Sequence, residues 1–262
     1  MIRITYAWIS PICFGTFHGT SLLPSQMKKK FTTELTASKD GVTVMGCRVL
    51  VNIASCHKHR AWQQSQRDTW LPELRCDYRF FLGNPKGDAE KDEVFLDCPD
   101  DYNSLIYKTV ESTKWALEHD YDFMFKCDVD TLVNPRNLLS SDFELHNYTG
   151  GRNGHFASGG SGYWLSRKAM EALVTEPPKG GSAEDVFVAD TVWRKHNLPL
   201  HEDNRYLYYP GCKLGTDTVT FHVSSCNGWP GDVPPYNPSM MHNRYLEMKD
   251  SKCLQQNCQI DC

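Results

Sequence analysis

The chain has 262 residues, of which 40% are hydrophobic and 23% are charged, a composition ordinary for a globular protein of one large domain or two small ones. A formal net charge of −4, with no basic block beyond residues 28–30, argues against a nucleic-acid-binding surface. The eleven cysteines include no C-x-x-C pair, which argues against a zinc module.

Residues 1–44 show no sustained periodicity and are expected to form an N-terminal extension. The first 23 residues are interrupted by Ser10, Pro11 and Gly15, and they lack the run of about 20 apolar residues that a spanning helix needs. Membrane association is therefore expected to be peripheral at most. A cytoplasmic or peripheral location is favoured, with the Golgi or a secretory lumen as the alternative. A targeting segment in residues 1–23 and the disulfide state of the cysteines stay open.

From residue 47 onward, apolar runs alternate with helical stretches. The apolar runs are typical of buried strands and cover residues 47–56, 78–83, 92–98 and 123–128. Helices are predicted over residues 60–70 and 104–119, and Pro135 is expected to start another helical turn. This alternation predicts an α/β fold whose mainly parallel sheet carries helices on both faces.

A glycine-rich run covers residues 150–162 and passes directly into the apolar residues 163–165. It is either a flexible linker or a binding loop whose backbone approaches a ligand, and the strand that follows it favours the binding loop. Residues 183–197 then predict a helix with Glu184 and Asp185 in its first turn. Two short strands are expected between residues 205 and 223. The residues expected on the buried side of the predicted helix are Val186, Ala189, Val192 and Trp193.

Two carboxylates, Asp128 and Asp130, follow the apolar run that begins at Phe123. They are either turn residues at the end of a strand or ligands of a divalent cation, whose charge would turn their repulsion into attraction. Ligands of parallel sheets bind at the carboxyl ends of strands, which favours the second interpretation. Such a cation can take up the charge of a departing nucleoside diphosphate. Oxygen ligands suit Mg²⁺ or Mn²⁺, and an added imidazole favours Mn²⁺.

Several motifs in order resemble the β-1,3-galactosyltransferase and Fringe-like glycosyltransferases, glycosyltransferase family 31. Between residues 48 and 223 they are QRDTW, FFLG, DDYNSLIYKT, FKCDVD, SGGSGYWLS and EDVFVAD. The resemblance implies a GT-A catalytic domain over residues 45–245, followed by a cysteine-containing tail over residues 246–262. It implies an inverting transferase that moves galactose or an N-acetylhexosamine from a UDP-sugar to a hydroxyl of a glycan or glycoconjugate acceptor. A β-1,3 linkage and Mn²⁺, with Mg²⁺ as the alternative ion, are implied as well; only the resemblance favours galactose.

The resemblance also assigns roles to the acidic residues. Asp128 and Asp130 would be the carboxylates for nucleotide and metal, Asp130 being the direct ligand, and His222 would complete the metal site. Asp185 would be the general base, with Glu184 as the next candidate. Each has a plainer alternative: Asp185 could be a favourable charge at a helix N-terminus, and His222 could be a core histidine that donates to a backbone carbonyl.

For donor binding, the resemblance places Arg67 and Lys108 near the nucleotide and Gly160 and Gly162 at the sugar pocket. Arg67 and Lys108 could instead be charges on helix surfaces.

The sequence also departs from the family. Val129 replaces the middle aspartate of the family's K-x-D-D-D motif, and Gln63 and Gln64 replace basic residues before R-x-T-W. The membrane anchor and long stem of eukaryotic members are not recognisable, so a compact version of the enzyme, of a bacterial or viral kind, is expected.

Two other functions compete with sugar transfer. A metal-dependent phosphohydrolase also needs acidic ligands, but it usually has more of them, often bridging two ions. A carbohydrate-binding protein without catalysis would not need both the D-x-D pair and Asp185.

Overall fold

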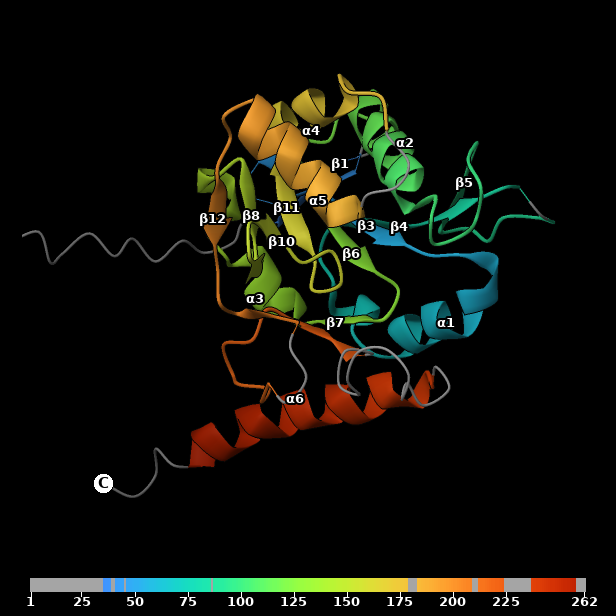
Figure 1. Ribbon diagram of the computed structural model, residues 1–262. Coiled ribbons are helices and arrows are strands. Elements are labelled where there is room, and N and C mark those ends of the chain that lie inside the picture. The colour runs from blue at the N-terminus through green and yellow to red at the C-terminus, as the bar shows by residue number, and fades with distance from the viewer. Residues whose placement is uncertain are drawn as a thin grey trace, which may run out of the picture. The chain divides into compact units, whose positions relative to one another are not determined.

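The computed structural model describes residues 35–38, 41–44, 46–85, 87–178, 183–208, 212–223 and 237–257 (Figure 1). The chain divides into two units, Met1–Thr32 and Thr33–Cys262, and all the described residues belong to the second. Within the described ranges, no helix combines the length and the apolar character that crossing a membrane requires.

A nine-stranded mixed sheet forms the centre of this unit. The strand β3 is parallel to β4 and β6, β4 is parallel to β5, and β8 is parallel to β12, whereas β11 lies antiparallel between β6 and β8. The bounds are β3 (Cys47–Ala54), β4 (Asp77–Gly83), β5 (Glu93–Leu96), β6 (Phe123–Asp128), β8 (Tyr148–Gly150), β11 (Tyr163–Ser166) and β12 (Leu200–Glu202).

Three smaller pieces extend this sheet or lie beside it. The hairpin of β1 (Leu35–Ser38) and β2 (Gly41–Val44) pairs with the first residues of β3, so strand pairing reaches into the expected N-terminal extension. The domain boundaries at residues 45 and 245 stay predictions. The other two pieces are separate sheets, one of β9 (Arg152–Asn153) and β10 (Phe156–Ala157), the other of β7 (Thr131–Val133), β13 (Tyr206–Leu207) and β14 (Thr220–His222).

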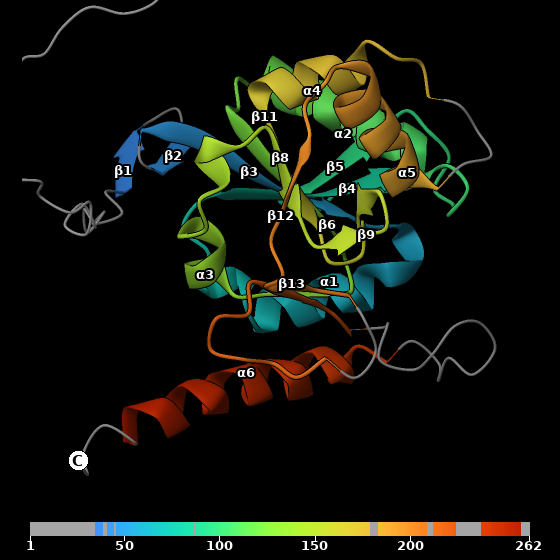
Figure 2. The ribbon, with the colours of Figure 1, turned by 60° about the vertical axis from the view of Figure 1, so that its left-hand side comes forward.

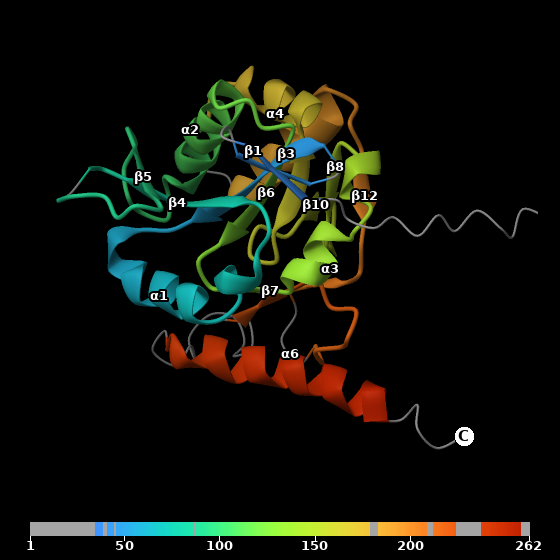
Figure 3. The same cartoon turned by 180° about the vertical axis from the view of Figure 1, so that it is seen from behind.

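Helices cover both faces of the central sheet, as Figures 1 and 3 show. One face carries α1 (Arg60–Asp68) and α3 (Pro135–Leu139), with α6 (Ser239–Asn257) packed farther out against α1 and β7. The other face carries α2 (Leu105–Glu118), α4 (Arg167–Val174) and α5 (Glu184–Ala189). Each face has its own hydrophobic core, with Trp62, Phe125 and Trp164 in the first and Met124, Tyr163 and Val188 in the second. The α/β fold class that underlies the GT-A expectation, a mainly parallel sheet between two helical layers, is confirmed (Figure 2).

Local sequence explains why the central elements form. In β3, Val49, Leu50, Val51 and Ile53 are fully buried, as the continuous apolar run of a parallel strand covered on both faces requires. The helix α4 begins after Ser166, whose hydroxyl caps it by accepting from the Ala169 N–H at 3.3 Å.

The helix expected over residues 183–197 differs from the prediction in two ways. It is α-helical only over Glu184–Ala189 and continues as one π-helical stretch, Asp190–Lys195. Val186 and Trp193, expected on the buried side, are only half-buried. The physical reason is that Glu184 faces inward and the π stretch changes the angle between successive residues, so apolar periodicity misplaces the buried face. The buried apolar residues are Phe187, Val188, Ala189 and Val192.

Candidate functional site

The D-x-D pair lies at the carboxyl end of β6, beside the end of β3. Ala54 is the register partner of Asp128, and the Val129 N–H donates to the Ala54 carbonyl at 3.0 Å. The backbone N–H of Asp128 donates to Thr131 Oγ1 at 3.1 Å, which closes the turn that carries Asp130. The side chains of Asp128 and Asp130 are 26% and 12% exposed, so both carboxylates retain some access to solvent.

The pairing of β14 with β7 brings His222 to this turn. His222 is the register partner of Thr131, and its Nε2 lies 3.3 Å from Asp130 Oδ2. Burial alone would lower the pKa of His222, but the charge and hydrogen bond of Asp130 raise it above the ordinary value. His222 thus lies beside Asp130, and its role as a metal ligand stays a prediction.

The glycine-rich run meets the D-x-D turn closely. Thr131 Oγ1 donates to the Gly160 carbonyl at 2.8 Å, and a Cβ atom at Gly160 would lie 2.6 Å from the His222 ring. At Gly162, φ is +84°, and a Cβ atom there would meet the Phe125 ring at 2.4 Å. Both positions therefore require glycine, Gly160 because it lies against His222 and Gly162 because it lies against Phe125 at a positive φ. Their contact with a donor sugar stays a prediction.

The two acidic residues at the start of α5 have different surroundings. Asp185 Oδ2 accepts from the Gly159 N–H at 3.3 Å, and Oδ1 accepts from the Val186 N–H at 2.9 Å. Burial raises the pKa of Asp185 despite these two donors. The Glu184 side chain is 3% exposed, and burial raises its pKa although Lys126 lies beside it.

Lys126 joins the D-x-D pair to the start of α5, through Asp128 and Glu184. As residues two apart on one strand, Lys126 and Asp128 project from the same face of β6. Lys126 Nζ donates to Asp128 Oδ1 at 2.8 Å and to Glu184 Oε2 at 3.1 Å. The adjacent carboxylates hold the pKa of Lys126 above its ordinary value although burial would lower it.

The two basic residues assigned to the nucleotide are engaged by protein groups. Arg67 binds Asp92 through two hydrogen bonds of 2.7 and 3.0 Å and lies 2.9 Å from Glu90. Lys108 is buried, donates to the Ser55 carbonyl, and lies 2.9 Å from Asp100 Oδ1. Neither is a loose charge on a helix surface, and their donor-binding roles stay predictions.

Three residues that sequence reasoning did not assign also shape this site. Lys126, Thr131 and Tyr163 make its internal hydrogen bonds, and the Tyr163 hydroxyl donates to Glu184. Lys126 could have been noticed, because a lysine inside an apolar strand has to find a buried partner. Tyr163 directly follows the glycine-rich run, but nothing in the sequence names its partner.

A divalent cation fits part of this arrangement. Asp130 and His222 already face each other and offer the oxygen and nitrogen atoms that suit Mn²⁺. The Asp128 carboxylate is hydrogen-bonded to Lys126. In the part of the chain that the structure describes, no cluster of three or more His, Cys, Asp or Glu side chains is arranged to hold a metal.

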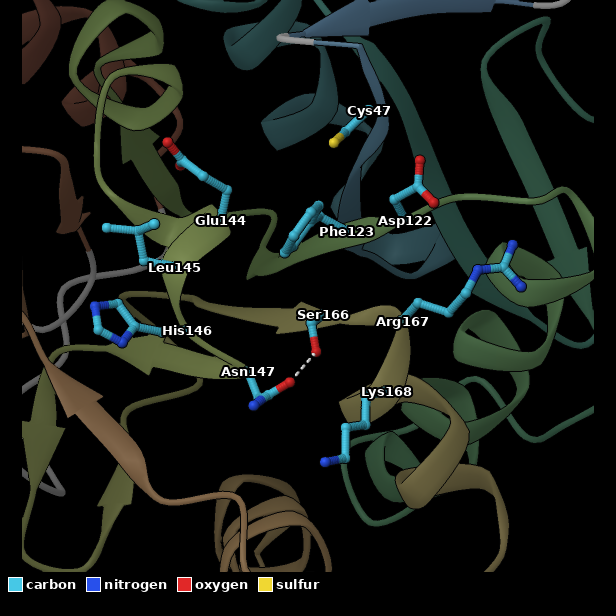
Figure 4. A pocket seen from close by; sticks show the side chains of 10 residues that line it. All are labelled: Cys47, Asp122, Phe123, Glu144, Leu145, His146, Asn147, Ser166, Arg167 and Lys168. Carbon is cyan, nitrogen blue, oxygen red and sulfur yellow. Dashed lines mark hydrogen bonds between the residues drawn. The ribbon is translucent and has the colours of Figure 1, made fainter. Parts of the chain in front are cut away.

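A separate cavity of about 360 Å³ opens at the other edge of the sheet (Figure 4). Cys47, at the start of β3, and Phe123, at the start of β6, line it, so it lies at the strand ends opposite the D-x-D pair. Ser166 Oγ donates there to Asn147 Oδ1 at 2.8 Å. The cavity contains none of the predicted site residues, and we do not assign it a role in their chemistry.

No family model matches the sequence. Solved structures with a similar fold include the glycosyltransferase GlyE of Streptococcus pneumoniae TIGR4, with 11% identity and a TM-score of 0.45 over 80% of this chain and 64% of that chain. This chain thus spans less than two thirds of GlyE.

Two other similar structures are also glycosyltransferases. The catalytic domain of Drosophila beta1,4galactosyltransferase 7, in complex with xylobiose, has 14% identity and a TM-score of 0.43, over 75% of this chain and 79% of that chain. The mannosyltransferase PcManGT of Pyrobaculum calidifontis, in complex with GDP-Man and Mn²⁺, has 9% identity and a TM-score of 0.45, over 82% and 76%.

Proposed function

We propose that this protein is a Mn²⁺-dependent, inverting hexosyltransferase that uses a UDP-sugar, with Mg²⁺ as the alternative ion. The observation that carries the proposal is the pair of contacts at the D-x-D turn. His222 lies beside Asp130, and Lys126 links Asp128 to the first turn of α5. The order of the sequence motifs supports a family 31 kind of enzyme. The acceptor in this proposal is a hydroxyl of a glycan or glycoconjugate, and the linkage is β-1,3.

Asp130 and His222 would hold the cation, with Asp128 on the donor side. A bound divalent cation supplies Lewis-acid stabilisation of the charge on a leaving diphosphate. Gly160 and Gly162 would line the sugar pocket with backbone alone, because protein atoms occupy the space that a side chain would need there. Lys126 offsets the charge of Asp128 where the strand ends.

Asp185 would take the proton from the acceptor hydroxyl as the new bond forms. Inversion by one displacement needs a base on the acceptor side and no nucleophile from the enzyme. Glu184 suits this role less, because its two carboxylate oxygens accept from Lys126, Tyr163 and Thr109 inside the core. Asp185 is less enclosed and receives only backbone N–H groups through its described hydrogen bonds.

Thermal unfolding with UDP, UDP-galactose, UDP-N-acetylglucosamine, UDP-N-acetylgalactosamine and UDP-glucose tests the proposal, each with and without Mn²⁺. Ligand-linked stabilisation grows with the ratio of ligand concentration to the dissociation constant. We expect UDP and one UDP-sugar to raise the melting temperature only with metal. Stabilisation by free sugars without nucleotide or metal would favour a carbohydrate-binding protein. Release of phosphate without sugar transfer would favour a phosphohydrolase.

Asp130→Ala is the matched variant for this test. It should abolish transfer and remove the metal dependence of UDP binding, because the direct ligand is gone. Near-normal transfer by this variant in the presence of EDTA would contradict the assignment of the D-x-D pair. The linkage is then read by NMR of the product formed with the donor that stabilises best.

A further inference from the structure

Lys126 is a fully buried cation in the middle of the central sheet. It has 0% exposure and lies on β6 as the register partner of Tyr163 on β11. An isolated ammonium group in a protein interior is strongly unfavourable unless carboxylates and hydrogen bonds satisfy it. Its placement therefore depends on the groups around it, which come from separate parts of the chain.

These groups tie four elements together. Lys126 Nζ donates to Asp128 on β6 and to Glu184 on α5. The second oxygen of Glu184 accepts from Tyr163 on β11 and from Thr109 Oγ1 on α2, the latter at 3.2 Å. Both charged partners of Lys126 are thus fixed, one at the strand end and the other at the helix start.

The glycine-rich run closes over this cluster. A Cβ atom at Gly159 would lie 2.7 Å from Glu184 Oε2 and 3.3 Å from Lys126 Nζ, so the backbone there is in close contact with the ion pair. The N–H of the same glycine donates to Asp185. A displacement of Lys126 or Glu184 would consequently reach Asp185 by two routes, through the adjacent residue and through Gly159.

We propose that Lys126 is a positioning residue that sets the distance between the donor-side carboxylate Asp128 and the base-bearing first turn of α5, with Glu184 as its anchor. The proposal rests on the proposed function, because it assigns Asp128 and Asp185 to opposite sides of the transferred sugar. Lys126 touches no reacting atom in this scheme. It acts through the two carboxylates that it binds.

Lys126→Met is the first test, since it removes the charge and keeps an unbranched side chain. It leaves Glu184 and Asp128 without their cation, so Lys126→Met with Glu184→Gln is the variant that returns the cluster to its original net charge and keeps an acceptor for Tyr163. Lys114→Met is the control, because Lys114 lies on α2 at the surface and pairs only with Glu111 in the described contacts.

The kinetic readout separates positioning from donor binding. We expect the double variant to keep its affinity for UDP with Mn²⁺ while kcat for transfer falls by about 10²-fold, the order expected for a small misplacement of reacting groups. Unchanged kcat would overturn the proposal. A loss of UDP affinity equal to the loss of rate would overturn it too, by making Lys126 a donor-binding residue.

A second readout needs neither sugar nor metal. Amide hydrogen exchange at Gly159 and in the first turn of α5 should accelerate in both Lys126 variants, while exchange in β3 stays as in the wild type. In Lys114→Met, exchange should stay unchanged at all these positions. Unchanged exchange at Gly159 would contradict the link to Asp185. If the wild type transferred no sugar from any donor, the proposed function would fail while this experiment still decided whether Lys126 positions α5.

Discussion

Asp185 combines two properties that a general base needs, limited burial and a fixed orientation. Two backbone N–H groups fix its carboxylate, and it adjoins the anchored Glu184. Asp185→Asn keeps the shape but cannot accept a proton. We expect transfer to fall by about 10²–10⁴-fold, the usual contribution of a positioned base, with UDP and Mn²⁺ binding retained. Steady-state kinetics and calorimetric titration with UDP measure the two effects.

Two results would contradict this role of Asp185. An equal loss of donor affinity and rate would make it a binding or structural residue. A product with retained anomeric configuration would rule out the single displacement in which the base acts.

The acidity of Asp185 predicts the acid side of the pH–rate profile. Burial raises its pKa above that of an ordinary aspartate, which is about 3.9. Because the base acts in its charged form, the rate of transfer should be highest above the raised pKa and should decline as the pH falls through it. The profile of kcat/KM at saturating Mn²⁺ checks this. A decline only near the ordinary aspartate value would show that Asp185 is not the group that titrates.

Gly160 offers a probe of the proposed metal site. Gly160→Ala would place a methyl group 2.6 Å from the His222 ring and should push the imidazole away from Asp130. We expect the Mn²⁺-dependent rise in melting temperature to shrink, as we also expect for His222→Ala. Gly151→Ala is the control, because its methyl group would clash with the Tyr206 carbonyl at 2.3 Å instead. It should lower metal-free stability and leave the rise caused by Mn²⁺ intact.

An ion pair between Arg67 and Asp92 joins α1 to the residue just before β5. Burial would raise the pKa of Asp92, but the hydrogen bonds and charge of Arg67 outweigh it and lower that pKa. The stabilisation is therefore present above the unfolded-state pKa and is lost as the pH falls through the lower folded-state value. Asp92→Asn should cost about 1.5–3 kcal/mol at neutral pH, the range for hydrogen bonds to charged groups.

Urea unfolding at neutral and at strongly acid pH measures this cost. The difference in unfolding free energy between Asp92→Asn and the wild type should vanish in acid, because the wild-type carboxyl is then protonated and uncharged like the asparagine amide. Asp120→Asn is the matched control: Asp120 pairs with Arg167, its side chain is 80% exposed, and asparagine tolerates its φ of +57°. We expect almost no change in the control. A cost at Asp92 that persists in acid would point to packing rather than charge.

For the whole molecule, sequence reasoning recovered the layers of the fold because periodicity and apolar runs are local signals. The strands ending at Gly83 and Asp128 and the helix over Leu105–Glu118 follow those signals closely. The D-x-D pair was placed at the correct edge because strand direction in a parallel sheet fixes which ends meet.

What sequence reasoning missed depends on contacts between distant residues. Lys126 and Glu184 are 58 positions apart, and no local pattern specifies that they pair. The partners of Arg67 are Glu90 and Asp92, which lie in the segment just before β5. The helix pattern around Arg67 does not reveal them. The π stretch after Ala189 likewise depends on tertiary packing, since its residues resemble an ordinary helix in composition.

The register of β11 also limits how this protein can evolve by insertion and deletion. Tyr163 faces the Glu184 cluster, whereas the next residue, Trp164, faces the opposite core and donates to the Tyr206 hydroxyl at 3.0 Å. A one-residue slip along β6 would exchange these two rings between the faces. Length changes should therefore be tolerated at the turn of the β9–β10 hairpin around Gly154, and be eliminated by selection within the strand itself.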